Sequence, residues 1–273
     1  MFTHVLYHAN CIDGFTGAWV ARKVLGDGAS YIPIYFGNSV EKLPPEAEAI
    51  MIDCAYSRED ILSLRGKIKR LAVLDHHVTH MEALEGLPDT VFDMNKSGAM
   101  LAWNYFMPRT EAPLLVKYVQ DRDLWSHKLP ATKSISAYIN GRIQDWGHWD
   151  ELERELEERF TGCIDKGETI LWMQDKYVES IVSLAFMTII DGHKVPAVNT
   201  PIFLSDVGHA LCLKYPDAPF AACYFENERG KRRWSLRSNN GFDCSAIAKK
   251  FGGGGHRAAC GYTEERTAPV AKL

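Results

Sequence analysis

The chain lacks the cysteine pattern of a disulfide framework or a zinc knuckle. Its 7 cysteines are an odd number, are widely scattered and contain no CxxC pair. No apolar run reaches membrane-spanning length, and Met1 to Asn10 lacks the basic, apolar and small-residue order of a secretory signal. We therefore expect reduced, mostly buried cysteines, no membrane association and a cytoplasmic location.

An excess of basic residues is missing as well. The sequence has 31 Lys and Arg against 35 Asp and Glu, a formal net charge of −4. This balance argues against a broad electrostatic surface for long nucleic acids and favours a local grip on any phosphate-bearing substrate. With 46% hydrophobic and 24% charged residues, the composition is that of an ordinary globular protein. A length of 273 residues allows one large or two ordinary domains.

Short apolar segments alternate with helical patterns in the N-terminal part of the chain. Such alternation implies a parallel, doubly wound sheet, because parallel neighbours require crossover helices. The predicted fold class is therefore α/β, with a mainly parallel N-terminal sheet. Strands are predicted at residues 3–8, 30–36, 49–53 and 68–74, and helices at 15–25 and 58–65.

Acidic and imidazole side chains follow these strands, at the sheet edge where open α/β folds bind ligands. They supply oxygen and nitrogen donors without thiolates, which suit Mn²⁺, Mg²⁺ or another divalent ion better than structural zinc. The number of carboxylates suggests two ions that share a bridging ligand, and such a pair, about 3.5–4 Å apart, suits hydrolysis of a phosphate ester. Taken singly, Asn10–Gly14 and Asp121–Asp123 also read as ordinary polar turns. The set comprises His8, Asp13, Asp53, Asp75, His76, His77 and Asp121.

The pattern changes beyond Trp125. Helices are predicted at residues 146–160 and 167–186, followed by a smaller α/β lobe with strands at 194–199, 220–225 and 233–237. Gly252 to Gly255 are expected to form a flexible loop, which beside His256 and Arg257 makes a phosphate cradle, with Arg237 as a further phosphate contact. A flexible hairpin connection would explain the glycines but not the histidine. The predicted domains are a metal-binding catalytic domain at 1–127, a helical linker at 128–190 and a substrate-binding domain at 191–273.

Five motifs in this order resemble the DHH phosphoesterase superfamily in its DHH plus DHHA1 form. They are His8 to Gly14, Asp53, Asp75-His76-His77, Asp121 in Asp121-Arg122-Asp123, and the Gly-rich stretch Phe251 to Ala259. The resemblance implies that His8, Asp13, Asp53, His76 and Asp121 are metal ligands, with Asp53 as the bridge. It implies further that Asp75 orients His76 or contacts the metal through its shell, and that His77 lies nearer the phosphate.

One departure concerns the first motif. The superfamily has two aspartates separated by one residue before the glycine, and Cys11 replaces the earlier one, with Asn10 beside it. Either Asn10 or Cys11 substitutes as a ligand, or this site is weak, selective for a softer ion, or vacant. We favour a substitute ligand, because decay would be expected to damage the other motifs too.

These observations predict a divalent-metal-dependent phosphoesterase acting on short nucleotides, most simply a 3′-to-5′ exonuclease of the oligoribonuclease kind. The alternatives are a small-molecule phosphatase for phosphoadenosine phosphate, polyphosphate or a cyclic dinucleotide, and an inactive nucleotide-binding protein. Substrate would be clamped between the lobes. The sequence implies no protein partner and leaves a homodimer open. Catalytic residues are predicted at Asp53, Asp75, His76 and His77, and substrate contacts at His77, Arg122, Arg237, Gly253, Gly254, Gly255, His256 and Arg257.

Overall fold

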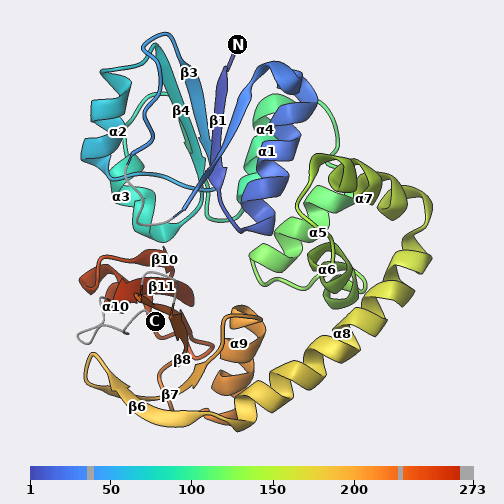
Figure 1. Cartoon of the computed structure of the whole chain (residues 1–273), viewed down its shortest axis with the longest axis vertical. Coiled ribbons are helices and arrows are strands. Elements are labelled where there is room, and N and C mark those ends of the chain that lie inside the picture. Colours follow the sequence, from blue (N-terminus) through green and yellow to red (C-terminus); the bar gives the residue numbers. More distant parts are fainter. Residues whose placement is uncertain (36–39, 227–229, 265–273) are drawn as a thin grey trace, which may run out of the picture. The chain divides into compact units, whose positions relative to one another are not determined.

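The computed structural model describes residues 1–35, 40–226 and 230–264 (Figure 1). The chain divides into two compact units, an N-terminal unit, Met1–Leu171, and a C-terminal unit, Trp172–Leu273. The predicted linker, residues 128–190, is thus shared between them. Within the described residues, no helix is both long and apolar enough to cross a bilayer.

The N-terminal unit is built on a parallel sheet whose strands are buried on both faces. Along β3, Ile50 and Ile52 contribute to the core on one face, whereas Ala49 and Met51 contribute to the core on the other. This explains why the strands read as continuous apolar runs rather than as alternating patterns. The predicted α/β class and parallel sheet are confirmed. In spatial order the strands are β2 (Ser30–Ile34), β1 (His4–His8), β3 (Glu48–Ile52), β4 (Arg70–Asp75) and β5 (Thr90–Phe92).

Helices cover both faces of this sheet, as Figure 1 shows. The larger core lies under α1 and α4 and includes the fully buried Trp19 and Trp149. Trp149 donates its indole N–H to Thr16 Oγ1 of α1 at 2.9 Å, so α7 is fixed against α1. One face carries α1 (Ile12–Leu25), α4 (Gly98–Phe106), α5 (Leu114–Asp123), α6 (Thr132–Asn140), α7 (Trp146–Glu158) and the start of α8 (Phe160–Ser183), and the other carries α2 (Arg58–Arg65) and α3 (Met81–Leu84).

The strand order β2-β1-β3 creates a switch point beside β1. The strand that follows β1 in the chain, β2, pairs with one edge of β1, and the next strand, β3, pairs with its other edge. Open α/β sheets bind ligands at such a point, outside the carboxyl ends of the strands. His8 ends β1 and Asp53 directly follows β3, its neighbour. The topology therefore brings these two side chains to the expected binding edge.

The C-terminal unit contains a mixed sheet with α9 (Leu204–Lys214) and α10 (Ser245–Lys250) packed against it. Two local predictions are wrong here. The helix predicted to reach Phe186 ends at Ser183, because Phe186 begins a strand that pairs with β7. Gly254 to His256 form a strand rather than a flexible loop. The sheet order is β10 (Gly254–His256), β11 (Ala259–Glu264), β9 (Arg232–Arg237), β8 (Ala221–Glu226), β7 (His193–Asn199) and β6 (Phe186–Ile190).

Candidate metal centre

Asp53 lies at the middle of the candidate site. Its N–H donates to Leu74 O at 2.9 Å, and its φ of 61° turns the chain sharply after β3. A left-handed backbone is uncommon for a residue other than glycine, and aspartate tolerates it. The carboxylate, 1% exposed, extends one oxygen toward His8 and the other toward His76: Oδ2 lies 3.2 Å from His8 Nδ1, and Oδ1 lies 3.0 Å from His76 Nε2. Asp53 thus joins two groups of donor atoms.

The first donor group consists of His8, Cys11 and Asp53. One ring nitrogen, the thiol sulfur and one carboxylate oxygen lie within 4.8 Å of one another. Cys11 reaches this position because it is the residue preceding α1, directly after the turn that leaves β1. Asn10, the other predicted substitute, occupies that turn with φ 55° and is exposed.

The second donor group consists of Asp13, His76 and Asp123, whose donor atoms also lie within 4.8 Å. His76 Nε2 lies 3.8 Å from Asp13 Oδ2 and 3.7 Å from Asp123 Oδ2. Asp13 is held in place by the N-terminus of α4, because the N–H groups of Gly98 and Ala99 donate to its two oxygens at 2.5 and 3.0 Å. Such N-terminal N–H groups stabilise a carboxylate.

Gly98 is required for this close approach. A Cβ on Gly98 would lie 2.5 Å from the Cβ of Asp53 and 3.0 Å from Asp13 Oδ2. Any side chain would therefore push the start of α4 away from the two carboxylates. The small residue after Ser97 is part of how the site is assembled.

Asp123, rather than the predicted Asp121, brings its carboxylate to the cluster. Asp121 accepts hydrogen bonds from the N–H groups of Lys128 and Leu129 at 2.9 and 3.0 Å and from the Thr132 hydroxyl, so it organises the loop after α5. Two residues further along, the Asp123 side chain is 26% exposed and faces His76. Positions two apart on a helix project about 200° apart, so only one of the pair can face the site.

Asp75 supports two imidazoles behind the donor groups. Fully buried, it accepts from His77 Nδ1 at 2.8 Å and also bonds to His80 Nδ1. Asp75 also accepts the backbone N–H of His76 at 2.8 Å. Asp75 thus holds the ring of His77, whereas the resemblance implies that it orients His76 or contacts the metal through its shell. Sequence reasoning missed His80, although it lies five residues after Asp75 at the same strand end.

The electrostatics of the cluster are strongly coupled. Burial and the charges of Asp53 and Asp123 raise the pKa of Asp13 well above its usual range. Burial alone would raise the pKa of Asp53, but hydrogen bonds from His76 and His8 lower it well below its usual range. For His76, burial has the opposite effect and would lower the pKa, because it disfavours the protonated imidazole. The hydrogen bond to Asp53 and the neighbouring carboxylates outweigh burial and raise the pKa of His76 to about 10. Ionisation of these neighbouring buried carboxylates is therefore favourable only when positive charge lies among them.

These residues fit divalent metal ions. Carboxylate oxygens and imidazole nitrogens are the donors that Mn²⁺ and related ions take, and Asp53 offers one oxygen to each group. A divalent cation would also supply the counter-charge that the buried carboxylates require. The donor chemistry and the charge therefore point to the same class of ligand.

A small cavity of about 90 Å³ lies beside the cluster in the N-terminal unit. Its walls include Cys11, Asp13 and Asp123 from the donor groups, and Arg122 adds a cation. The Arg122 guanidinium lies 4.1 Å from the ring centre of Trp125. The predicted substrate contact Arg122 is thus next to the donor groups. The remaining lining residues are Ile12, Tyr118, Val119, Ser136, Ile139 and Asn140.

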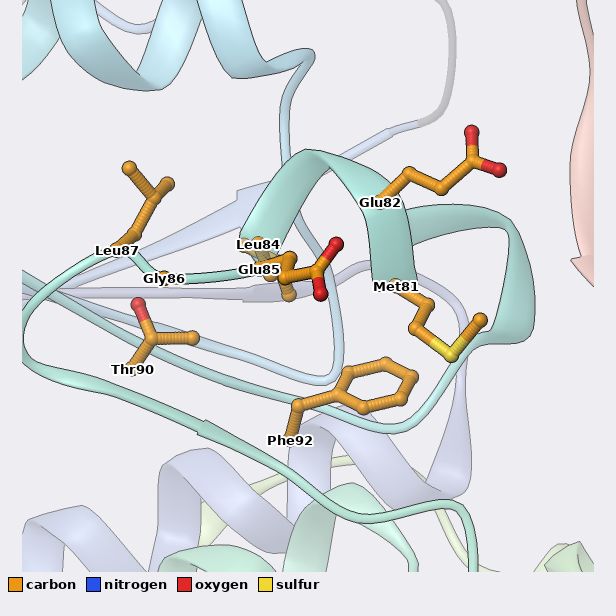
Figure 2. A pocket seen from close by; sticks show the side chains of 8 residues that line it. All are labelled: Met81, Glu82, Leu84, Glu85, Gly86, Leu87, Thr90 and Phe92. Carbon is orange, nitrogen blue, oxygen red and sulfur yellow. The ribbon is translucent and has the colours of Figure 1, made fainter.

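A larger hollow of about 320 Å³ lies elsewhere in the same unit, beside α3 and β5 (Figure 2). Met81 and Phe92 form part of its apolar wall, while Glu82 and Glu85 bring carboxylates to it. A phosphate-bearing ligand would meet negative charge there. The smaller cavity, by contrast, adjoins the donor groups.

In the C-terminal unit, three of the predicted substrate residues, Gly254 to His256, form β10, and Arg237 ends β9. Gly253 directly precedes β10, and Arg257 lies in the turn that follows it. Gly253 must be a glycine, because a Cβ would lie 2.1 Å from Gly261 O, and Gly255 has a φ of 132°. The glycines therefore serve the close packing of β10 on β11. The exposed Arg257 forms an ion pair with Asp243 at 3.2 Å. Arg237 donates to the hydroxyls of Ser235 and Ser205, each at 2.9 Å.

One known protein family matches the C-terminal part of the chain. Residues 203–268 match the model of the family described as the DHHA1 domain. The C-terminal part of the chain thus matches the DHHA1 domain, and the chain as a whole is similar to proteins of the DHH superfamily. The predicted resemblance is confirmed.

Relatives extend over nearly the whole chain. An uncharacterized protein of Acanthamoeba polyphaga mimivirus is 31% identical over 281 residues, covering 94% of this chain and 66% of that protein. Oligoribonuclease NrnB of Bacillus subtilis (strain 168) is 24% identical over 302 residues, covering 95% of this chain and 73% of that protein. The chain thus spans about two thirds to three quarters of the length of these relatives.

A solved structure of an exopolyphosphatase-related protein from Bacteroides fragilis resembles this fold, with a TM-score of 0.52 and 13% sequence identity. The likeness covers 98% of this chain and 87% of that one. At this identity the likeness shows a shared fold and no more.

Proposed function

We propose that the protein is a divalent-metal-dependent phosphoesterase that hydrolyses short nucleotides, with 3′-to-5′ oligoribonuclease-like activity. The observation that carries the proposal is the carboxylate of Asp53, whose two oxygens face two separate donor groups. One ion would be held by His8, Cys11 and Asp53, and the other by Asp13, Asp53, His76 and Asp123. When bound, the ions would supply water activation and charge neutralisation.

The remaining residues would bind and orient the substrate. His77, fixed through Nδ1 by Asp75, would direct its other ring nitrogen to a phosphoryl oxygen. Burial opposes the protonated form of His77, but the charge and hydrogen bond of Asp75 raise its pKa, which suits a donor to phosphate. Arg122 would contact the substrate from the cavity beside the cluster, and Arg237, His256 and Arg257 would contribute from the DHHA1 domain.

Two further observations support a short nucleotide over a long strand. The net charge of −4 provides no broad basic track for a long strand. The relative NrnB is an oligoribonuclease by name. The second candidate function is that of a small-molecule phosphatase, because one structural neighbour is an exopolyphosphatase-related protein by name.

Hydrolysis of a substrate panel tests the proposal. The panel holds an RNA dinucleotide and pentamer, a DNA pentamer, a cyclic dinucleotide, 3′-phosphoadenosine 5′-phosphate and polyphosphate, each with Mn²⁺, Mg²⁺ or chelator. We expect the short RNAs to be shortened from the 3′ end with Mn²⁺ and left intact with chelator. Turnover of only the phosphoadenosine phosphate or polyphosphate would establish the second candidate instead. Nucleotide binding without hydrolysis under any condition would contradict both.

His256→Ala is expected to weaken substrate binding more than chemistry. A lost charge-assisted hydrogen bond to phosphate should raise KM for the RNA pentamer roughly tenfold or more, with kcat changed little. Steady-state kinetics measure both constants, and Lys249→Ala, which removes an exposed cation from α10, is the matched control. An equal loss of kcat and kcat/KM in His256→Ala would assign His256 to the chemical step.

A further inference from the structure

The two donor groups differ in one atom type. The group at Asp13, His76 and Asp123 offers oxygen and nitrogen, whereas the group at His8 and Asp53 includes the sulfur of Cys11. Thiolates favour borderline and soft ions, while carboxylates suit Mn²⁺ and Mg²⁺. The difference therefore predicts different metal preferences on the two sides of Asp53.

Cysteine is an unusual residue directly before a helix, and the backbone N–H of Gly14 in the first turn of α1 is directed at the Cys11 sulfur. Cys11 is the N-cap residue of α1, with extended φ and ψ of −122° and 131°, yet its side chain makes no capping hydrogen bond. Asp, Asn, Ser and Thr are the residues that cap helices well. The position thus carries a poor capping residue, whose sulfur lies within 4.8 Å of donor atoms of His8 and Asp53.

The other cysteines lie in different surroundings. They are buried, for example Cys163 in the core beneath α7 and Cys212 beneath α9, whereas Cys11 is half-buried. Cys11 also lines the cavity beside the cluster. A ligand in that cavity can reach its sulfur.

We propose that the His8–Cys11–Asp53 group selects a thiophilic divalent ion such as Zn²⁺, Co²⁺ or Fe²⁺, while the Asp13–His76–Asp123 group takes Mn²⁺ or Mg²⁺. This inference rests on the proposed function in requiring that the cluster binds metal. In it, Cys11 coordinates as the thiolate and its proton passes to solvent. Mg²⁺ alone is then expected to fill one group and leave the other poorly occupied.

Cobalt spectroscopy on the full chain tests the inference without relying on activity. A thiolate bound to Co²⁺ produces an intense sulfur-to-metal charge-transfer band in the near ultraviolet, which oxygen and nitrogen ligands do not. We expect this band to saturate at one Co²⁺ per chain. Cys11→Ser and Cys11→Asp should abolish it, and Cys11→Asp should shift the ratio of Co²⁺ to Mn²⁺ affinity on the order of tenfold or more toward Mn²⁺.

Two matched variants assign the band. Cys163→Ala removes a buried cysteine of the same unit and should keep it, and Asp123→Asn changes the other donor group and should keep it too. The amount of bound cobalt, measured after equilibrium dialysis, distinguishes failure of this inference from failure of the proposed function. Cobalt bound without the band, in protein that still hydrolyses phosphate esters with Mn²⁺, overturns this inference alone. Binding of no divalent ion overturns the proposed function as well.

Discussion

Asp53→Asn is expected to remove nearly all hydrolytic activity, by roughly 10³-fold or more in kcat. The amide keeps the size of the side chain and tolerates the left-handed backbone at φ 61°, so the turn after β3 should survive. What is lost is the charge shared by both donor groups. Kinetics with the RNA pentamer in Mn²⁺ measure the effect.

Metal-dependent stability provides an independent readout of the same variant. Mn²⁺ at 100 times its Kd should stabilise the wild type by about 2.7 kcal/mol, because only the native state holds the ligands together. In Asp53→Asn this rise in Tm should largely disappear. A full rise together with lost activity would mean that Asp53 acts in chemistry without holding metal.

Asp89→Asn is the matched control for this substitution. Asp89 has a φ of 49°, close to that of Asp53, and lies away from the cluster in an exposed ion pair with Arg70 at 2.8 Å. The same chemical change on a similar backbone should cost about 1 kcal/mol or less and leave kcat within about twofold. Equal loss of activity in both variants would point to a general effect of the amide rather than to the site.

Asp123→Asn is expected to lower kcat without lowering stability, whereas Asp121→Asn is expected to lower stability with little change in kcat. Asp123 faces His76, so its amide should lower kcat by roughly 10²-fold or more while the protein stays folded. Neutralising one of three neighbouring carboxylates should leave the Tm of the metal-free protein unchanged or slightly higher, since burial and the charge of Asp53 oppose ionisation of Asp123. Kinetics and thermal unfolding are measured on the same samples.

Asp121→Asn should lower stability instead. The amide cannot accept all the hydrogen bonds that the carboxylate receives from Lys128, Leu129 and Thr132, a loss of about 2 kcal/mol, or roughly 4–8 °C in Tm. Well below that Tm, kcat should stay within about threefold of wild type. If Asp121→Asn proves inactive but stable and Asp123→Asn remains active, Asp121 is the ligand that the sequence predicted.

Residues that follow parallel strands were predictable as members of one site. His8 ends β1, Asp53 follows β3 and His76 follows β4, and the carboxyl ends of parallel strands meet at one edge of the sheet. No knowledge of packing is needed for that step. The strand order then placed His8 and Asp53 on adjacent strands.

Residues on helices and hairpins were not predictable in this way. Which carboxylate of α5 faces His76 depends on how the helix is rotated when Leu115, Tyr118 and Val119 pack into the core. The pairing of Gly254 to His256 depends on β11, which the local glycine pattern does not specify.

The sequence by itself determined the alternation of strands and helices, the donor residues at the strand ends and the resemblance to the DHH and DHHA1 proteins. Only the tertiary structure decided that Asp123 rather than Asp121 faces the cluster, that Asp75 orients His77, and that Cys11 lies within reach of His8 and Asp53. The physical reason is that the direction of a buried strand and the chemistry of a side chain are local properties. The rotation of a helix and the pairing of strands are set by contacts between segments far apart in the chain.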